Sequence, residues 1–518
     1  MSPSDPRLTP AEAHSRPLSF SARPDDARAK RTRWRVSVHL IPWLFFLYIL
    51  AFLDRANIQV ASLAMMKPPN EQGLGFNSDI IGFASGIFFW GYWILEIPST
   101  VSVGRWGARW VFVRILVLWG LCATLVGAIG TPFAHSFFSW LPHIQSPPEY
   151  LQAVIRFINE LPDSAKYQLY FFRFMLGFFE GGFFPSVIFY LSLWFRTEDR
   201  AKAIATFMSA IPFSNIVGAF ISGQLLRVNW FGVPGWRWIF VLEGIAPIVA
   251  GVATIFLLPD RPATVKWLPE DERAWLLSEL NREHEAKKGQ GHWAWVHHLG
   301  TVVLLTAVYF GLNLTSYGIT FFMPAIIKSQ LAMDPKDQVL LFGFLPTTSD
   351  QLASYLSGLV YLTGLVGMLV NGWHSDRTGE RPWHVAVPLI LWSAGIFLMA
   401  LLEGHWIWPM LMLFLLIGPF MYAHLPAFWP IPTMFLGATA AASAIGFINM
   451  IGNLGGSAGP MIVGKEVTGQ TSFASSLLLV APWPLLSAVL VLIAGYLRRR
   501  SSRPKEAVPD AANRPLLK

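Results

Sequence analysis

The stretch VSVHLIPWLFFLYILAFLDRANIQVASLAMM, residues 36–66, decides the fold class. Its only Asp, Glu, Lys or Arg residues are Asp54 and Arg55, and a polar segment, residues 1–35, precedes it. A helix of about 20 apolar residues crosses the hydrocarbon core of a bilayer, so the stretch predicts a membrane span. The polar segment is too long for a signal peptide and has no small-residue cleavage site after a short apolar core, so we expect this span to stay in the mature protein.

Apolar blocks of similar length recur along the whole chain. Hydrophobic residues make up 53% of the sequence and charged residues 14%, against about 25% charged residues in soluble domains. The blocks cover residues 39–66, 80–101, 111–130, 169–195, 203–226, 238–258, 301–327, 352–370, 385–402, 406–430, 440–463 and 476–496. The sequence therefore predicts an all-α membrane protein with twelve transmembrane helices.

The positions of the basic residues argue against a nucleic-acid partner, despite the net charge of +8. Twelve spans place both termini on one side, and 29 of the 39 Lys and Arg residues fall on that side, with 8 on the other. Lys and Arg are enriched in cytoplasmic loops. We expect a multi-pass protein of a plasma membrane, the bacterial inner membrane, with both termini in the cytoplasm.

A long hydrophilic stretch, residues 259–298, divides the spans into two six-helix halves, residues 38–258 and 299–498. The tails, residues 1–37 and 499–518, are polar, and we expect them to be disordered in the cytoplasm. An insertion after the third span, residues 131–167, contains one short predicted helix but no readable function.

Within residues 259–298, an acidic turn precedes an apolar stripe formed by Trp275, Leu276 and Leu280. This pattern predicts a short amphipathic helix that lies on the cytoplasmic membrane surface.

The two halves repeat one feature at corresponding places. GRWGAR (104–109) follows the second span, and GWHSDRTGER (372–381) follows the eighth. Both are basic turns, and internal repeats of this kind are typical of alternating-access transporters, which bind substrate between their halves. We therefore expect pseudo-symmetric halves, with a gating role for Arg105, Gly107, Arg109, Asp376, Arg377 and Gly379.

Asp54 and Arg55 lie inside the first span, where an ionisable side chain costs about 2.5–3.5 kcal/mol even on a mild scale. Adjacent residues project about 100° apart on a helix, so a simple ion pair between the two is not expected. One arrangement has Arg55 facing the central cavity and Asp54 facing a neighbouring helix. In the alternative, both lie near one membrane surface and extend toward water.

Arg173 and Glu180 lie seven residues apart in the fourth span and so project from one helix face. Arg offers a two-pronged donor for a carboxylate, which indicates an anion-binding residue. Burial penalises a charged carboxylate, so Glu180 is a candidate proton carrier, with Asp54 as its assistant. The alternative is a structural ion pair that locks spans one and four.

Further polar side chains inside spans are weaker candidates for substrate contact: Tyr92, Asn313, Tyr317, Asn449 and Asn453. For the tyrosines, ordinary interhelical contacts remain an alternative. Glu96, Glu243 and Glu403 lie closer to span ends and are interpreted as structural.

Several kinds of chemistry are excluded by the motifs. The single cysteine, Cys122, rules out a disulfide within the chain, and no zinc-ligand spacing is present. No phosphate-binding GxxxxGK[ST] motif occurs, and the glycines of residues 452–459 lack the strand that a dinucleotide site requires. We expect no enzyme activity, no metal and no cofactor.

Six stretches together resemble the anion:cation symporter family of the major facilitator superfamily. They are FLDRANI (52–58), YWILEIP (92–98), RFMLGFFEGGFFP (173–185), WFRTEDRA (194–201), SDRTG (375–379) and NMIGNLGGSAGP (449–460). The family includes permeases for tartrate, phthalate, galactonate and hydroxyphenylacetate. The phrase EGGFFPSVIFY (180–190) is most similar to the tartrate and phthalate permeases.

The resemblance implies that Arg55 and Arg173 bind the anion and that Asp54 and Glu180 couple protons. It further implies that Tyr92 and Asn449 line the cavity. This chain departs from the family at Gly104, where an acid is usual, which puts a charge lock at that turn in doubt. At residues 210–212 some sugar-acid carriers have a polar amide where this chain reads AIP, which disfavours a hydroxyl-rich substrate.

The sequence thus predicts a monomeric, proton-coupled importer of a small mono- or dicarboxylate such as a tartrate- or phthalate-like acid. Sodium coupling is left open. Alternatives are a facilitator or exporter of another class of small molecule, such as cationic drugs, and a sensor that binds anions without moving them. Buried arginines disfavour the cation exporter.

Overall fold

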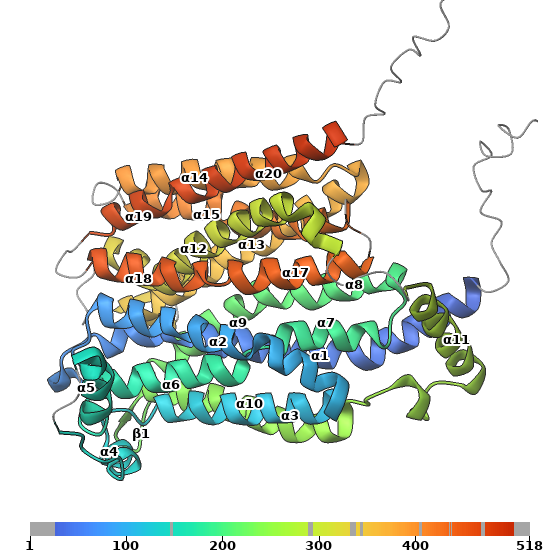
Figure 1. The fold of residues 1–518 in the computed structure, drawn as a ribbon. Coiled ribbons are helices and arrows are strands. Elements are labelled where there is room, and N and C mark those ends of the chain that lie inside the picture. Colours follow the sequence, from blue (N-terminus) through green and yellow to red (C-terminus); the bar gives the residue numbers. More distant parts are fainter. Residues whose placement is uncertain are drawn as a thin grey trace, which may run out of the picture.

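The computed structural model describes residues 26–145, 149–287, 294–331, 338–341, 345–402, 407–434, 436, 438–467 and 472–501. Long helices run side by side and form two bundles, drawn blue to green and yellow to red in Figure 1. We call the side where α1 begins and α20 ends the terminus face, and the opposite side the far face.

Apolar blocks separated by Gly, Pro and polar residues form the helices of the first bundle. They are α1 (Asp26–Met65), α2 (Ser78–Trp106), α3 (Ala108–Val126), α6 (Ala165–Glu180), α7 (Phe183–Ser192), α8 (Thr197–Met208), α9 (Ala210–Leu225) and α10 (Gly235–Leu257). Gly181 and Gly182 separate α6 from α7, and Gly182 has a φ of 86°, a left-handed conformation that favours glycine.

The second bundle repeats this arrangement. Its helices are α12 (Leu299–Gln330), α13 (Ser349–Thr378), α14 (Pro382–Leu402), α15 (Ile407–Ala423), α16 (Leu425–Phe428), α17 (Ala438–Gly452), α18 (Gly455–Val467), α19 (Ala474–Val480) and α20 (Pro482–Ser501).

Short elements connect these helices. They are η1 (Pro69–Glu71), α4 (Pro132–Phe138), η2 (Glu149–Leu151), α5 (Gln152–Glu160), η3 (Pro262–Thr264), α11 (Glu270–Lys287), η4 (Ala294–His298) and η5 (Ile431–Met434). Two antiparallel hairpins pair β1 (Asn229–Trp230) with β2 (Val233–Pro234), and β3 (Gln338–Leu341) with β4 (Leu345–Thr348).

Within the described residues, eleven helical segments are long and apolar enough to cross a membrane. Each accounts for one predicted span, and α17 with α18 supplies the remaining one, interrupted after Gly452. The predicted all-α fold of twelve spans in two halves is confirmed.

Close contacts between small residues join the two halves near the far face. A Cβ atom placed on Gly82 of α2 would lie 2.3 Å from the carbonyl oxygen of Pro460 and 3.0 Å from the Cα atom of Gly464. Such close approach is possible because these glycines carry no Cβ. At a second junction, Ser354 Oγ of α13 donates a hydrogen bond of 2.6 Å to the carbonyl oxygen of Ala219 in α9.

Charged side chains strengthen this junction. Asp350, at the start of α13, accepts Nζ of Lys67 from the first half at 2.7 Å and Nζ of Lys328 from the second half at 2.6 Å. One carboxylate thus holds the ends of α1, α12 and α13 together. The far face is closed by both apolar packing and this ion-pair cluster.

Helix α11 confirms the helix expected in the hydrophilic stretch but corrects its location. Trp267, just before it, stacks on His39 of α1 with ring centroids 4.1 Å apart, and Leu276 is buried. Glu272 also lies 3.8 Å from Arg35 of α1. The apolar stripe therefore packs against protein rather than a membrane surface, because α1 extends far enough to cover it (Figure 1).

The same contacts correct the predicted extent of the N-terminal tail. Helix α1 begins at Asp26, so residues 26–37 are helical rather than disordered. Arg33 donates to Asp199 at 2.8 Å, which anchors this extension to α8. Residues 1–25 and 502–518 of the predicted tails lie outside the described part of the chain. In the insertion, α5 confirms the short helix expected there.

Candidate functional site

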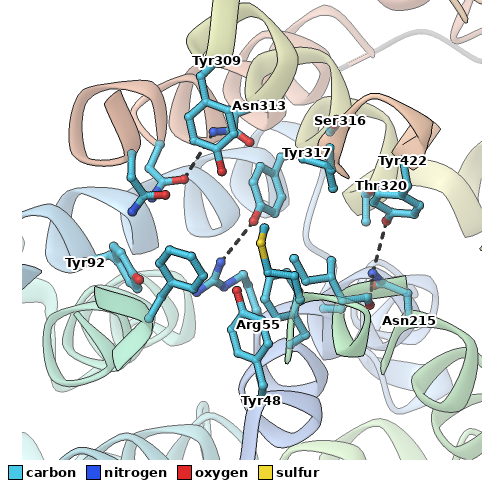
Figure 2. Close-up of a pocket in the computed structure, with 18 of the residues that line it drawn as sticks. Tyr48, Arg55, Tyr92, Asn215, Tyr309, Asn313, Ser316, Tyr317, Thr320 and Tyr422 are labelled. Carbon is cyan, nitrogen blue, oxygen red and sulfur yellow. Dashed lines mark hydrogen bonds between the residues drawn. The ribbon is translucent and has the colours of Figure 1, made fainter. Parts of the chain in front are cut away.

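A cavity lies between the two halves (Figure 2). The first half lines it with residues of α1, α2, α7, α8 and α9, and the second half lines it with residues of α12, α15, α16 and α17. Most of its lining residues come from the middle of the spans that these helices form. They include Tyr48, Phe52, Arg55, Tyr92, Phe184, Met208, Ile211, Asn215, Tyr309, Asn313, Tyr317, Thr320, Tyr422, Leu425, Trp429, Asn449 and Asn453. The lining is mainly aromatic and amide-bearing, as is usual for a site that binds small molecules.

Arg55 is the one cation among the described residues that line this cavity. Its guanidinium lies over three aromatic rings, with centroid distances of 4.6 Å to Phe52, 5.1 Å to Phe88 and 5.2 Å to Tyr92. Nη1 donates a hydrogen bond of 3.1 Å to Oη of Tyr317 in the other half (Figure 2). The rings stabilise the cation by their electron-rich faces while leaving its edge able to bind a ligand.

Glu180 neutralises Arg55 from the first half. Nη2 of Arg55 donates to Oε1 of Glu180 in a buried ion pair, and Glu180 is the last residue of α6. Glu180 does not line the cavity itself, so Arg55 lies between the cavity and this carboxylate. An unpaired charge here would cost several kcal/mol, so the two side chains depend on each other.

Asp54 faces away from Arg55, toward α3. Its Oδ2 accepts a hydrogen bond of 2.8 Å from Nε1 of Trp119, and both side chains are fully buried. This confirms the predicted arrangement in which Arg55 faces the cavity and Asp54 faces a neighbouring helix. The alternative of two side chains that extend toward water is wrong because both residues are buried in the bundle.

Arg173, the second predicted anion-binding residue, lies away from the cavity in this structure. Arg173 is fully buried and does not line the cavity. It donates hydrogen bonds to the backbone carbonyl oxygens of Ala84, Asp54 and Arg55, at 3.4, 3.3 and 3.4 Å. Arg173 therefore holds the α1 backbone that carries Arg55. Spans one and four are joined by an ion pair, as the structural alternative proposed, but its cation is Arg55.

The predicted polar residues of the second half do meet at the cavity. Nδ2 of Asn313 donates to the carbonyl oxygen of Gly452 at 3.1 Å and to Oδ1 of Asn453 at 3.3 Å. These bonds form where α17 ends, because the interruption after Gly452 leaves backbone groups available to a side chain.

Asn449 meets a partner that the sequence did not suggest. Its Nδ2 donates a hydrogen bond of 2.6 Å to Oε1 of Glu96 in the first half. Glu96, interpreted as structural near a span end, therefore lies one hydrogen bond from the cavity. Glu243 fits the structural interpretation, since it accepts a bond of 2.6 Å from Ser222 within the same half. Glu403 lies outside the described residues.

Two further polar contacts between the halves were missed by sequence reasoning. Asn215 lines the cavity and donates to Oη of Tyr422 at 3.2 Å (Figure 2). Tyr361 donates to Oε1 of Gln59 at 2.9 Å. Gln59 lies one helical turn beyond Arg55, and this spacing was a usable signal for a second polar residue on that face.

The two basic turns make contacts within their own halves. In the first, the backbone N–H of Arg109 donates to Asp260 at 2.9 Å, Gly107 lies against the same carboxylate, and Arg105 is exposed. Asp260 thus supplies an acid to a turn whose own sequence lacks one at Gly104.

In the second turn, Arg381 pairs with Asp376 at 2.7 Å, and Arg377 lies over the ring of Trp373. Gly379 ends α13 with a φ of 68°, a left-handed conformation that favours glycine.

Comparison with known proteins agrees with this architecture. The model of the Major Facilitator Superfamily matches residues 44–460. A candidate tartrate transporter of Agrobacterium vitis is 34% identical over 494 residues, which cover 94% of this chain and 95% of that protein. A quinolone resistance transporter of Acinetobacter baumannii is 30% identical, covering 84% of this chain and 88% of that protein.

Among solved structures, a bacterial homologue of the human lysosomal transporter Spinster, in an inward-facing and unoccupied conformation, superposes with a TM-score of 0.64. It is 14% identical to this chain, and the match covers 92% of this chain and 99% of that one. At this identity the likeness concerns the fold alone.

Proposed function

The chain belongs to the major facilitator superfamily and is a multi-pass membrane transporter, and on this premise we propose that it carries a small organic anion together with a proton. The observation that carries the proposal is Arg55, a buried cation that lines the cavity where both halves meet. A mono- or dicarboxylate such as tartrate or phthalate fits this cation. The similarity to a candidate tartrate transporter supports the same substrate class.

Binding of the anion competes with the ion pair inside the protein. Arg55 bonds to Glu180 on one side and to Tyr317 on the other. A substrate carboxylate that enters the cavity reaches the same guanidinium, which has donors for more than one partner. Substrate then shares the charge that stabilised Glu180, and the carboxylate of Glu180 becomes poorly neutralised.

Proton uptake by Glu180 resolves this competition. A protonated Glu180 no longer needs the charge of Arg55, so Arg55 is free to bind the substrate carboxylate fully. Loss of the substrate on the other side of the membrane returns Arg55 to Glu180 and expels the proton. Anion and proton are thus linked through one guanidinium. Asp54, held by Trp119, interacts electrostatically with Glu180 and Arg173 and assists Glu180 in carrying the proton.

The remaining candidates take supporting roles in this proposal. Tyr92, Asn313, Tyr317, Asn449 and Asn453 contact the bound anion. The basic turns, with Arg105, Gly107, Arg109, Asp376, Arg377 and Gly379, stabilise the other state of the cycle, in which the terminus face is closed. The two six-helix halves comprise residues 38–258 and 299–498, and the monomer is the working unit.

We further propose that the terminus face is cytoplasmic and that the protein lies in the bacterial inner membrane. The excess of Lys and Arg on this side supports that orientation. With its far face closed by the Asp350 ion pairs, the structure then corresponds to a state directed toward the cytoplasm.

Uptake of radiolabelled tartrate into proteoliposomes with an imposed proton gradient tests the proposal. The wild type should accumulate tartrate above equilibrium. Glu180→Gln should still exchange tartrate across the membrane but should not accumulate it. Glu272→Gln is the control, because it neutralises another buried glutamate that lies beside Arg35, away from the cavity. Accumulation by Glu180→Gln at the wild-type level would show that Glu180 is not the proton carrier.

A second candidate function is export of another class of small molecule. The similarity to a quinolone resistance transporter and the aromatic lining of the cavity favour it. Arg55→Ala separates the two functions. If the wild type binds tartrate and Arg55→Ala does not, the result supports anion transport. If the wild type does not bind tartrate and Arg55→Ala still exports the drug, the result supports the exporter. A non-transporting sensor predicts binding without flux in the same vesicles.

A further inference from the structure

Glu96 and Asn449 form a buried hydrogen bond between the two halves at the wall of the cavity. Glu96 lies in α2 and Asn449 in α17, the Nδ2–Oε1 distance is 2.6 Å, and both side chains are at least nine-tenths buried. Asn449 lines the cavity, whereas Glu96 lies behind it. The mechanism based on Arg55 and Glu180 does not use this carboxylate.

The charge of Glu96 fixes the orientation of the Asn449 amide. A charged carboxylate only accepts hydrogen bonds, so the nitrogen end of the amide must face it. The carbonyl oxygen of Asn449 is then the end left for a ligand in the cavity. An acceptor at this position disfavours a carboxylate, because two acceptors cannot share a hydrogen bond.

Protonation of Glu96 permits the opposite orientation. A protonated carboxyl group can donate its O–H to the oxygen of the Asn449 amide. The amide then turns about its last side-chain torsion, which has a broad, two-fold preference and offers little resistance. Its nitrogen end faces the cavity, where two N–H groups can donate to an anion.

The surroundings of Glu96 connect the rotation of the Asn449 amide to substrate binding. Arg55 from α1, Tyr92 from α2 and Tyr309 from α12 interact electrostatically with Glu96, and Arg55 is the cation among them. The positive charge of Arg55 favours a charged Glu96. An anion that binds Arg55 cancels this effect, so anion binding and proton uptake at Glu96 reinforce each other.

We propose that Glu96 and Asn449 are a proton-linked switch that turns a hydrogen-bond acceptor at the cavity wall into a donor for the bound anion. Glu96 is a positioning residue, since it acts on the substrate through Asn449. The proton enters from water through the cavity and leaves to water when the anion is released. The inference rests on the proposed anion transport but requires neither Glu180 nor Asp54 to carry a proton.

Proton uptake on anion binding tests the switch directly. Purified protein in weakly buffered solution is mixed with tartrate, and a pH-indicator dye reports the number of protons taken up. Glu96→Gln keeps the shape and can bond to Asn449 in either orientation, but it cannot titrate. We expect this variant to take up one proton fewer than the wild type. Glu272→Gln, which neutralises a buried glutamate away from the cavity, is the control and should match the wild type.

The pH dependence of the tartrate dissociation constant is the second readout. Linkage to one proton changes the constant by up to about tenfold per pH unit, and the dependence should weaken in Glu96→Gln. Asn449→Ala, which removes the amide and leaves Glu96 in place, should weaken it as well. If Glu96→Gln fails to fold, the pH dependence of tartrate binding in Asn449→Ala tests the switch instead.

Equal proton uptake by wild type and Glu96→Gln, or an unchanged pH dependence in a folded Asn449→Ala, overturns the switch. These outcomes leave the proposed function intact, because tartrate still binds. Absence of tartrate binding to the wild type, with or without protons, instead overturns the proposed function and the switch with it.

Discussion

Arg55 of the first half donates a hydrogen bond to Tyr317 of the second half, with an Nη1–Oη distance of 3.1 Å. The cation of the cavity is thus part of the contact between the halves. A ligand that binds Arg55 acts where the two bundles meet. Relative motion of the bundles must change the surroundings of this guanidinium, which makes substrate binding and conformational change sensitive to the same side chain.

Arg55→Lys should weaken tartrate binding by about tenfold to a hundredfold. Lysine keeps the positive charge but cannot donate to Glu180, Tyr317 and a ligand in fixed directions, and a hydrogen bond to a charged group contributes about 1.5–3 kcal/mol. Isothermal titration calorimetry measures the change. Arg237→Lys is the control, because Arg237 bonds to the backbone oxygens of Gly127 and Ile129 away from the cavity. Equal affinity in both variants would exclude Arg55 as the anion-binding residue.

Arg173→Leu should lower the stability of the protein, by about 1–3 kcal/mol, because three helix carbonyl oxygens each lose an additional donor inside the bundle. Thermal unfolding in nanodiscs measures this loss. Tartrate binding should weaken only to the extent that loss of these bonds displaces Arg55 from its position at the cavity. A variant with unchanged stability and abolished binding would instead mean that Arg173 contacts the substrate.

Asp54→Asn should fold normally, because the amide oxygen of Asn can still accept the hydrogen bond from Trp119. The variant removes only the carboxylate of Asp54, which interacts electrostatically with Glu180 and Arg173. We expect tartrate accumulation driven by a proton gradient to fall, but less than in Glu180→Gln. Trp119→Phe provides the comparison, since it removes the hydrogen bond and keeps the charge. Full accumulation in Asp54→Asn would remove Asp54 from the coupling mechanism.

Asp350→Asn should open the far face more often. The substitution removes the charge that holds Lys67 and Lys328 together. Cys122 is the single cysteine, so Cys122→Ser gives a cysteine-free background. In that background Ser457→Cys, buried in α18 against α2, reports opening.

The rate at which a bulky polar maleimide labels this reporter should rise severalfold in Asp350→Asn. Glu71→Gln is the control, because Glu71 is an exposed acid of the same face. Equal labelling rates in the Asp350 variant and in the control would show that the ion-pair cluster does not hold the halves together.

The fold was predictable because a bilayer imposes one requirement on every span. Apolar blocks of the necessary length marked the helices, and the basic turns marked the repeat. The start of α1 was not predictable, since residues 26–35 are rich in Arg and resemble a disordered tail. Their helix is stabilised by Asp199 and Glu272, which lie far away in the sequence.

The candidate site was predictable only in part. Charges inside spans are costly, and this identified Arg55, Asp54 and Glu180. The partner of each side chain was harder to predict. Arg173 shares a helix face with Glu180 but bonds to backbone oxygens, because α1, α2 and α6 cross at this point. Glu96 was interpreted as structural because it lies near a span end. Its partner, Asn449, belongs to the other half, so the sequence alone did not indicate their contact.

Helix α1 is a single rod that runs from the docking surface of α11 to the cavity and on to the far face. Its 40 residues correspond to about 60 Å, twice the thickness of a hydrocarbon core. The segment outside the membrane therefore amplifies small tilts of the part that holds Arg55. A fluorophore on this projecting arm, paired with one on α20, would follow the transport cycle from a position that never touches the substrate.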